Sequence, residues 1–311
     1  MVQEGKVEDM QISAIGDLAH EAMLCEVSAT PKPGLVDRAT NGAHRDMDFF
    51  TFLSSATALR RSFDEFARIG ADHAAEAAAS LLPYLQAAGI VAERRMFAAT
   101  NGINTHKGMI FSLGLLAGAA GWAMKRGEAL TTDHLCTLVA EMCEGLTAAA
   151  YAHVEKKPAE ERTKGEAMFL CYGVTGVRGE AESGFATVRL FAMPVYRRRR
   201  EEGFCVNDAL CDTLLALIGS NMDTNILGRH DMAALRYAQQ AARNVAMLDG
   251  MHTEAGCRAI RALDEDFTKR WISPGGSADL LAVTHFLYEL ERRFEQGRLH
   301  QAEPVTANCF A

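Results

Sequence analysis

The stretch that decides the fold is Asn101-Gly102-Ile103-Asn104-Thr105-His106-Lys107-Gly108, which leads into an apolar segment beginning near Met109. The two glycines let the backbone bend and approach a ligand closely. Asn104 or Thr105 can cap the helix that follows, and free N–H groups at a helix start attract anions. Lys107 adds a positive charge and His106 a titratable group. An ordinary helix cap with two polar surface residues is the alternative interpretation of this stretch taken alone.

Helical periodicity continues on both sides of this stretch. Apolar residues recur at helical spacing from Ile12 to Val27, and the run Thr30-Pro31-Lys32-Pro33-Gly34 ends that helix because two prolines cannot continue it. Further helices are expected at 49–70, 72–100, 107–126, 131–153, 181–193, 205–219, 231–249, 252–271 and 277–296. The Ala-rich residues 71–79 are interpreted as a close helix–helix contact. Because no alternating strand pattern or internal repeat is present, residues 1–311 are predicted to form a single all-α domain with Gly/Asp-rich loops between helices.

Composition narrows the class of protein. The chain has 311 residues, 49% hydrophobic and 23% charged, with a formal net charge of −8. These proportions are ordinary for a folded soluble domain. The negative charge argues against a general nucleic-acid binder, which usually carries a basic face. An anionic small-molecule substrate is still allowed, because its site needs only a local cluster of Lys and Arg.

The cysteines and the chain ends indicate the cellular compartment in which the protein is expected. None of the 8 cysteines forms a C-x-x-C pair, so neither a zinc ribbon nor a thioredoxin motif is present. The N-terminus lacks the basic and apolar regions of a signal peptide, and no apolar run reaches the roughly 20 residues of a membrane span. A cytoplasmic protein with free cysteines is expected, and the tail from Gly297 to Ala311 is expected to be poorly ordered.

The loop 32–48 carries carboxylates, a histidine and cations close together: Asp37, Asp46, Asp48, His44, Lys32, Arg38 and Arg45. Carboxylates at this spacing can hold a hard cation, and Mg²⁺ typically binds through one or two of them plus substrate phosphates. The alternative is that Asp46 or Asp48 caps the next helix and the rest is solvated. Asp48 suits the capping interpretation, because two phenylalanines follow it immediately.

Three more loops are rich in glycine and polar residues. Residues 220–225 include Asp223 and are typical of an Asx turn. Residues 273–279 contain Gly275-Gly276, a tight turn that presents backbone N–H groups to an anion, and Ser277, which can cap a helix starting at 278. Asp279 would then lie in the first turn of that helix. The loop 173–180 adds Arg178, a possible phosphate clamp.

Other motifs are absent or ambiguous. The run Arg197 to Arg200 is followed by two glutamates and is interpreted as a solvated linker rather than a substrate patch. No Walker A, dinucleotide-binding or G-x-S-x-G motif is present. The residues alone therefore indicate a helical protein that handles phosphate and Mg²⁺, without naming a reaction.

Taken together, the loops resemble one family, the triphosphoribosyl-dephospho-CoA synthases. The matching stretches occur in family order: Glu26-Val-Ser-Ala-Thr-Pro-Lys-Pro-Gly-Leu-Val-Asp37, Asn41-Gly-Ala-His-Arg-Asp-Met-Asp48, Asn104-Thr-His-Lys-Gly108, Gly176-Val-Arg-Gly-Glu-Ala-Glu-Ser-Gly-Phe185, Asp223-Thr-Asn225 and Ser273-Pro-Gly-Gly-Ser-Ala-Asp-Leu-Leu281. The run Tyr196 to Glu202 is not part of the family pattern and is interpreted as a local elaboration.

The resemblance implies a transferase that joins the ribose of ATP to the 2′-hydroxyl of 3′-dephospho-CoA and expels adenine, keeping the triphosphate intact. Such a transfer passes through an oxocarbenium-like state, which carboxylates can stabilise. The product would pass to an acyl-carrier-protein transferase and serve citrate lyase or malonate decarboxylase. Mg²⁺ is the implied cofactor, and a homo-oligomer is possible.

Within this scheme the residues receive hypothetical roles. The Mg²⁺ or transition-state carboxylates are Asp37, Asp46, Asp223 and Asp279. The contacts to triphosphate or coenzyme are Lys32, Asn104, Thr105, His106, Lys107, Arg178, Gly275, Gly276 and Ser277. The candidates for proton transfer are His44, Asp46 and Glu180.

Two other functions remain open at this point. One is a Mg²⁺-dependent all-α hydrolase of an N-glycosidic or ADP-ribosyl bond, with water as acceptor. The other is a non-catalytic protein that binds nucleotide or dephospho-CoA.

Overall fold

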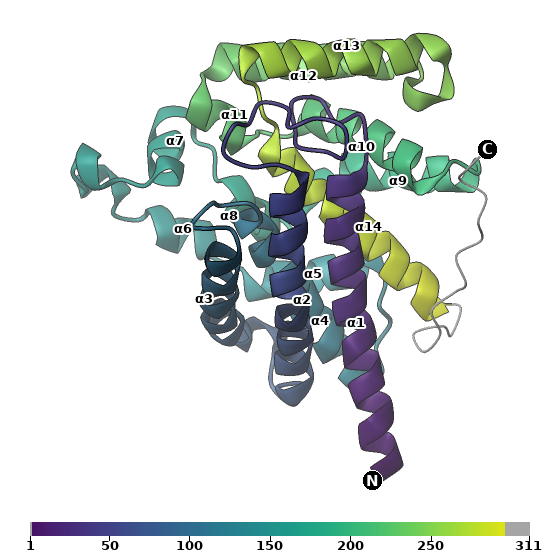
Figure 1. Ribbon diagram of the computed structural model, residues 1–311. Coiled ribbons are helices and arrows are strands. Elements are labelled where there is room, and N and C mark those ends of the chain that lie inside the picture. The colour runs from purple at the N-terminus through teal and green to yellow at the C-terminus, as the bar shows by residue number, and fades with distance from the viewer. Residues whose placement is uncertain (1, 296–311) are drawn as a thin grey trace.

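The computed structural model describes residues 2–295, and within that range it contains fourteen α-helices and no strand (Figure 1). The all-α class is therefore confirmed; the single domain stays a prediction, and the expected disorder of the tail lies outside the described residues. The α-helices are α1 (Val2–Ser28), α2 (Phe49–Asp72), α3 (Leu82–Ala99), α4 (Lys107–Lys125), α5 (Thr132–Met142), α6 (Leu146–Tyr151), α7 (Lys164–Tyr172), α8 (Gly176–Glu182), α9 (Met193–Glu201), α10 (Val206–Ser220), α11 (Thr224–Arg229), α12 (Met232–Ala246), α13 (Glu254–Arg270) and α14 (Gly275–Glu295).

Helix α4 is the centre of the core. It packs against α1, α2, α3 and α14, and most of its residues are buried. It approaches α2 so closely that a Cβ added at Gly118 or Gly121 would collide with α2–α3 atoms, and one at Gly70 of α2 would collide with the α4 backbone. Small residues therefore let these two helices meet at backbone distance. In the described chain α4 is the one helix apolar and long enough to cross a membrane, but 83% of its 18-residue apolar window is buried inside the fold, as in a core helix.

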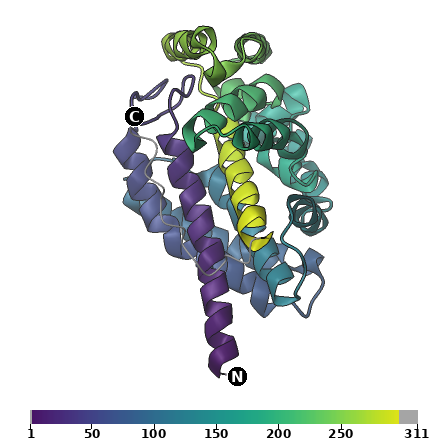
Figure 2. The same ribbon diagram turned by 90° about the vertical axis from the view of Figure 1, so that its right-hand side faces the viewer.

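Helices α1 and α14 pack against each other: α14 crosses behind α1 in Figure 1, and the two lie side by side in Figure 2. Helices α12 and α13 pack on each other across one end of the molecule (Figure 2). The loop 29–48 is tied to this end: Gly34 N donates to Asp264 Oδ1 of α13 at 3.0 Å, and Thr30 N donates to Asn207 Oδ1 of α10 at 3.0 Å. The loop that carries several candidate residues is thus held on two sides.

Several helix boundaries differ from those expected. The helix expected over 72–100 is interrupted between α2 and α3 by a turn and a short 3-10 helix, Ala78–Ser80, so the Ala-rich segment is not the helical contact that was predicted. The helix expected over 131–153 breaks before α6, where Gly145 adopts φ +75°. The expected capping by Asp48 is confirmed, since its side chain accepts a hydrogen bond from Thr51 N at 2.8 Å.

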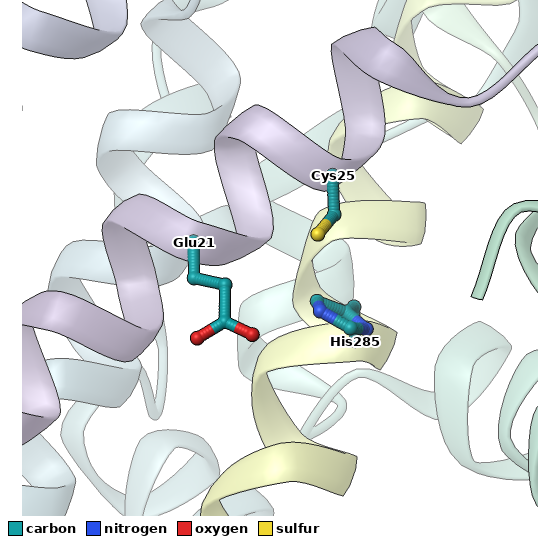
Figure 3. A group of neighbouring side chains, drawn as sticks. All are labelled: Glu21, Cys25 and His285. Carbon is teal, nitrogen blue, oxygen red and sulfur yellow. The ribbon is translucent and has the colours of Figure 1, made fainter. Parts of the chain in front are cut away.

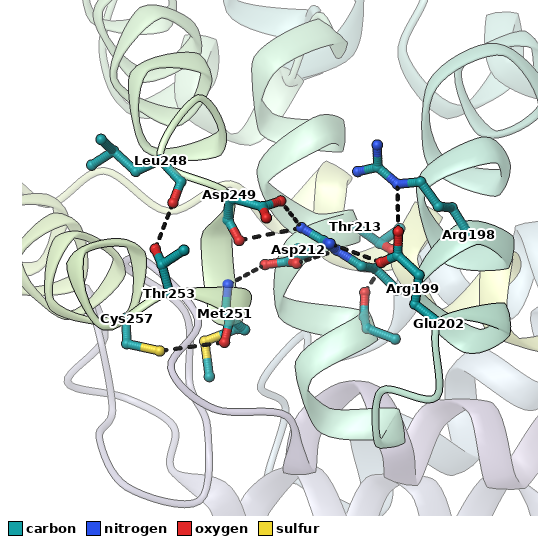
Figure 4. A network of polar contacts seen from close by, with 11 residues as sticks. Arg198, Arg199, Glu202, Asp212, Thr213, Leu248, Asp249, Met251, Thr253 and Cys257 are labelled. Atoms are coloured by element: carbon teal, nitrogen blue, oxygen red, sulfur yellow. Dashed lines mark hydrogen bonds and ion pairs between the residues drawn. The ribbon is translucent and has the colours of Figure 1, made fainter.

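The arginine run is helical, so the solvated-linker interpretation was wrong. Arg197 to Arg200 lie in α9, which follows a π-helical turn, Val188–Ala192. The Arg199 side chain is only 5% exposed and forms ion pairs with Asp212 (2.7 Å), Asp249 (2.5 Å) and Glu202 (2.9 Å), as Figure 4 shows. Burial of a guanidinium is tolerated here because three carboxylates surround it. Sequence could not show those partners, because two of them lie on distant segments.

The described cysteines are all free thiols. Burial raises the pKa of Cys25, Cys136 and Cys143 to about 12, so these thiols stay protonated at neutral pH.

Candidate active site

The loops converge on one cavity of about 970 Å³. Its wall is built by the end of α1, the loop 29–48, parts of α2, α3 and α4, the start of α8, the α10–α11 segment and the first turns of α14. Eleven candidates from the sequence line it: Lys32, His44, Asp46, Asn104, Thr105, Lys107, Arg178, Glu180, Gly275, Gly276 and Asp279. The other four candidates, Asp37, His106, Asp223 and Ser277, are buried and lie outside the lining.

A buried ion pair forms part of the wall. Lys32 Nζ donates a hydrogen bond to Glu26 Oε1, and the two side chains are 1% and 2% exposed. Burial raises the pKa of Glu26, while the Lys32 ammonium opposes that shift. Glu26 was not a candidate from the sequence, because it lies inside the helical pattern of α1. Its signal is a carboxylate on a buried helix face, in the last turn of the helix that precedes the Pro-Lys-Pro-Gly turn.

Asp279 is the carboxylate with the least compensation. It lies one turn into α14 and lines the cavity, and among residues 2–295 it has no hydrogen-bond or ion-pair partner. Burial, with the nearby charges of Glu26 and Asp223, raises the pKa of Asp279 well above its usual value. Its Oδ2 faces Gly108 in the first turn of α4, where a Cβ would collide with it. The positive end of the α4 dipole therefore lies beside an acid that lacks a countercharge.

Asp223 joins two loops instead of facing the cavity. Its Oδ1 accepts from Asn225 N at 2.9 Å and from Gly276 N at 3.3 Å. Its Oδ2 accepts from Ser277 N at 2.8 Å and from Ser277 Oγ at 2.9 Å. Ser277 thus lies inside α14 and does not cap a helix starting at 278, as had been expected, because α14 begins at Gly275. A metal role for Asp223 stays a prediction, and it would require these donors to be displaced.

Asp37 likewise accepts several hydrogen bonds within its own loop. Its Oδ1 accepts from Ala39 N (2.7 Å) and Thr40 N (2.8 Å), and its Oδ2 accepts from Thr30 Oγ1 (2.6 Å) and Lys32 N (3.2 Å). The side chain is 2% exposed. Asp37 therefore holds the loop that presents Lys32; its metal role is untested.

His44 and Asp46 lie at the rim beside Arg229, which sequence reasoning had passed over. His44 Nε2 is 2.9 Å from Ser273 Oγ, and Arg229 Nη1 donates to Ala43 O at 3.0 Å. Burial, then the Arg229 charge, lowers the pKa of His44 to about 4, so the imidazole is neutral at pH 7. The Asp46 side chain is 64% exposed and 3.8 Å from His44 Nδ1. Arg229 ends a short helix, where a cation is usually interpreted as dipole compensation, so its sequence signal was weak.

Residues 104–107, at the start of α4, include both exposed and buried side chains. Lys107 Nζ pairs with Glu93 at 2.9 Å, and Asn104 Oδ1 accepts from Lys107 N at 3.2 Å. Thr105 Oγ1 donates to Ser55 Oγ at 2.7 Å, which in turn lies 2.7 Å from His106 Nδ1. His106 is completely buried, and burial, then the Lys32 charge, lowers its pKa to about 3. His106 thus stands behind Thr105 and Ser55, not in the lining itself.

Helix α8 contributes one carboxyl group, Glu180, and one guanidinium group, Arg178. Glu180 accepts from the Thr187 hydroxyl and from Thr187 N, and burial raises its pKa. Arg178 is exposed at the cavity and, like Arg229, has no carboxylate partner within residues 2–295. Two guanidinium groups without carboxylate partners on one cavity wall are suited to a polyanion, because each can bind phosphate oxygens with two hydrogen bonds.

The donor set also fits a hard cation. Magnesium usually takes one or two carboxylates, waters and substrate phosphates, without a complete protein cage. Asp279, which is uncompensated and beside the cavity, and Asp46, which is exposed at its rim, are the carboxylates whose oxygens are accessible for this purpose. The residues present therefore fit the ligand chemistry of Mg²⁺.

Comparisons with known proteins identify the family of the chain. Residues 12–298 match the sequence model of a family described as ATP:dephospho-CoA triphosphoribosyl transferase. A 2-(5''-triphosphoribosyl)-3'-dephosphocoenzyme-A synthase of Klebsiella pneumoniae is 43% identical over 282 residues, which is 91% of this chain and 92% of the relative. Relatives described as probable synthases of this kind are 44% identical in Photobacterium profundum (284 residues; 89% of this chain, 87% of the relative) and 42% in Vibrio cholerae (281 residues; 90% and 89%). No solved structure matches the chain. The resemblance expected from the loops is thus confirmed, and the chain belongs to the ATP:dephospho-CoA triphosphoribosyl transferase family.

Proposed function

We propose that this cavity transfers the triphosphoribosyl group of ATP to the 2′-hydroxyl of 3′-dephospho-CoA and releases adenine. The observation that carries the proposal is one cavity of about 970 Å³ that combines two guanidinium groups with a carboxylate, Asp279, none of which has an ion-pair partner among residues 2–295. That volume is at the upper end for ligand sites, as expected where two nucleotides must meet.

The positive groups suit the triphosphate. Arg178 and Arg229 are available for its oxygens, and Gly275 adds a backbone N–H at the start of α14, whereas Gly276 N already donates to Asp223 Oδ1. Lys32 is already paired with Glu26, so it contributes charge to the wall without being a free ligand. Mg²⁺, when bound at Asp279 and Asp46, would neutralise the charge of the triphosphate.

The transfer breaks the bond between ribose C1′ and adenine and forms a bond between C1′ and the acceptor oxygen. The acceptor hydroxyl loses a proton and adenine gains one. Asp46 is the exposed carboxylate suited to take the proton from the hydroxyl, with neutral His44 3.8 Å away. Glu180, whose pKa burial raises, is suited to hold a proton for the departing base. The carboxylates along the wall also stabilise the oxocarbenium-like sugar between these events.

Adenine release tests the proposal. Purified protein receives Mg²⁺ with ATP, with dephospho-CoA, or with both, and products are identified by mass. Adenine that forms only with both substrates, together with a triphosphoribosyl adduct, is the expected result. Adenine from ATP alone would support the hydrolase instead, and binding without adenine would support the carrier protein.

The two arginines provide a sharper version of the assay. Arg229→Gln and Arg178→Gln are expected to raise the KM for ATP by about tenfold or more, since each charge-assisted hydrogen bond contributes about 1.5–3 kcal/mol. Arg258→Gln is the matched control, because that side chain is 70% exposed on α13 and pairs only with Glu254. An unchanged KM in both cavity variants would contradict the assignment.

The downstream steps extend the same proposal. The product would pass to an acyl-carrier-protein transferase that serves citrate lyase or malonate decarboxylase, and the setting would be the cytoplasm. A homo-oligomer stays a prediction that sedimentation can test.

A further inference from the structure

A cluster of metal-ligand side chains lies between α1 and α14, apart from the cavity lining. Glu21 and Cys25 are four residues apart in α1, so they share one helix face, and His285 faces them from α14 (Figure 3). One ligand atom from each residue lies within 4.8 Å of the other two. Cavity chemistry does not use any of the three.

The histidine is the member that lacks an explanation. His285 is 2% exposed, and its Nδ1 lies 2.7 Å from the Tyr196 hydroxyl, which leaves Nε2 as the other ring nitrogen. Within residues 2–295, Nε2 has no hydrogen-bond partner although it is buried. Leaving such a group unpaired costs about 1–3 kcal/mol. A metal ion bound to Nε2 would remove that cost, and histidine ligands usually hydrogen-bond through their second nitrogen as Nδ1 does here.

The charges around the cluster balance for a divalent ion. Burial, with Glu21 and Glu289 nearby, raises the pKa of Cys25, and burial lowers the pKa of His285, so thiol and imidazole are both neutral without a metal. A divalent ion with a thiolate and a carboxylate has no net charge. The competing cation is Arg293, whose Nη2 donates to both Glu21 carboxylate oxygens, at 2.9 and 2.7 Å. Zinc would share or displace these bonds, and Arg293 would keep Glu289, 3.4 Å away, as a partner. Arg292 is paired with Glu289 as well.

We propose that Glu21, Cys25 and His285 bind Zn²⁺, with solvent as the fourth ligand. Sulfur, imidazole and carboxylate together suit zinc, and its bond lengths place tetrahedral ligand atoms about 3.5 Å apart. Closing the cluster to that spacing needs a shift of about 1 Å, which Glu21 can supply because its side chain is 39% exposed. The same exposure gives the ion and its water access to solvent.

The site would clamp the two helices that frame the cavity. Cys25 precedes Glu26 directly in α1, and His285 follows Asp279 in α14 by less than two helical turns. A metal bridge would therefore fix the separation of the helices that carry Glu26 and Asp279, two of the carboxylates that line the cavity. The proposal rests on the cluster alone and does not depend on the proposed function.

Zinc binding to the full chain tests it. Protein stripped with a chelator is dialysed against Zn²⁺ alone, and bound metal is counted. Wild-type protein is expected to hold one equivalent, and Cys25→Ser to lose at least about tenfold in affinity. Cys257→Ser is the matched control, because Cys257 is another half-buried thiol, with Sγ 3.5 Å from Met251 O. Equal binding by both variants, or no stoichiometric binding by the wild type, would overturn the proposal.

Two further readouts avoid variants that fail to fold. Co²⁺ in place of Zn²⁺ is expected to give thiolate-to-cobalt charge-transfer absorption that is absent in Cys25→Ser, and Zn²⁺ is expected to protect the Cys25 peptide from alkylation in the wild-type protein. Tyr196→Phe removes the hydrogen bond to His285 Nδ1 and is expected to weaken zinc binding by about tenfold. Absence of both the absorption and the protection would refute the site.

Discussion

Replacing Gly108 with alanine tests whether the position of Asp279 limits the reaction. Gly108 is the second residue of α4, and its hydrogen occupies the only space between that helix and the Asp279 carboxylate. A methyl group there would lie well within 3.0 Å of Asp279 Oδ2, a distance that real Cβ atoms essentially never reach. Either the carboxylate or the start of α14 must therefore move.

The size of the effect follows from that overlap. Asp279 has to move by about 1 Å, and a misplacement of that size can lower a rate about 100-fold, equivalent to about 2.7 kcal/mol of activation free energy. The helix itself gains, since alanine is favoured over glycine in a helix by up to about 1 kcal/mol. We therefore expect a folded protein with a much lower kcat for adenine release.

The assay compares Gly108→Ala with Gly89→Ala. Gly89 lies in α3 and lines the same cavity, and a Cβ added there meets no atom within 4 Å. This variant therefore controls for an added methyl group in the cavity that does not move Asp279. Adenine release is measured at saturating substrates, and thermal unfolding confirms the fold of each variant. A kcat for Gly108→Ala within threefold of the wild type, in folded protein, would refute the reasoning. If that variant unfolds, Asp279→Asn provides the same test without the collision.

Three other predictions concern charge. Asp46→Asn is expected to remove most turnover and to leave the unfolding free energy unchanged, because the side chain is 64% exposed; near-normal turnover would reject its role. Arg199→Met is expected to lower the unfolding free energy, measured with denaturant, by about 3–5 kcal/mol, because it leaves the buried Asp212 carboxylate without its ion pair. The control is Arg198→Met at an exposed position, which is expected to change the unfolding free energy by less than about 0.5 kcal/mol. Equal effects of the two substitutions would contradict the role of the Arg199 network. Burial lowers the pKa of His106 to about 3 in the folded protein. Between pH 6.5 and pH 3 the unfolded chain therefore binds a proton on this imidazole that the native state does not. The contribution of His106 to the free energy of unfolding is thus largest above pH 6.5 and decreases as the pH falls toward 3. His106→Gln should reduce that acid-side slope, measured by denaturation at several pH values, by one proton, and an unchanged slope would count against it.

The sequence predicted the helices best where periodicity was long and local. Helix α4 was expected at 107–126 and spans Lys107–Lys125, because its apolar run is bounded by polar residues and glycine. The break after α2 was missed because it contains neither proline nor glycine. It is stabilised by tertiary contacts, including the hydrogen bond from Trp122 Nε1 to Glu76 O at 3.1 Å.

Prediction of the site residues also succeeded where the sequence signal was local and failed where a residue's role depends on tertiary contacts. Loop residues such as Asp46 and Asn104 could be chosen from the sequence, because polar residues between helices have few structural alternatives. Arg178 was also chosen, although it lies in α8 and not in the loop expected over 173–180. Glu26 could not be chosen, since it fits the helical pattern of α1. Arg229 fell between two expected helices and outside the loop 220–225, in the unexpected helix α11. Each acquires its place only when distant segments meet. Sequence also could not separate Asp279, which has no hydrogen-bond partner in the described part of the chain, from Asp223, which accepts from three N–H groups and one hydroxyl. That distinction depends on the fold.

The hydrogen bonds of Asp223 mean that two loops beside the cavity become ordered when the chain folds, before a substrate binds. The Asp223 carboxylate accepts hydrogen bonds from the start of α11 and from the start of α14, so the two loops that precede these helices form one rigid unit and do not move independently. The conformational entropy of ordering them is lost when the chain folds, and little of it is left to lose when a nucleotide arrives. A substrate would meet a preformed surface on this side of the cavity, and any closing motion would have to come from the opposite wall.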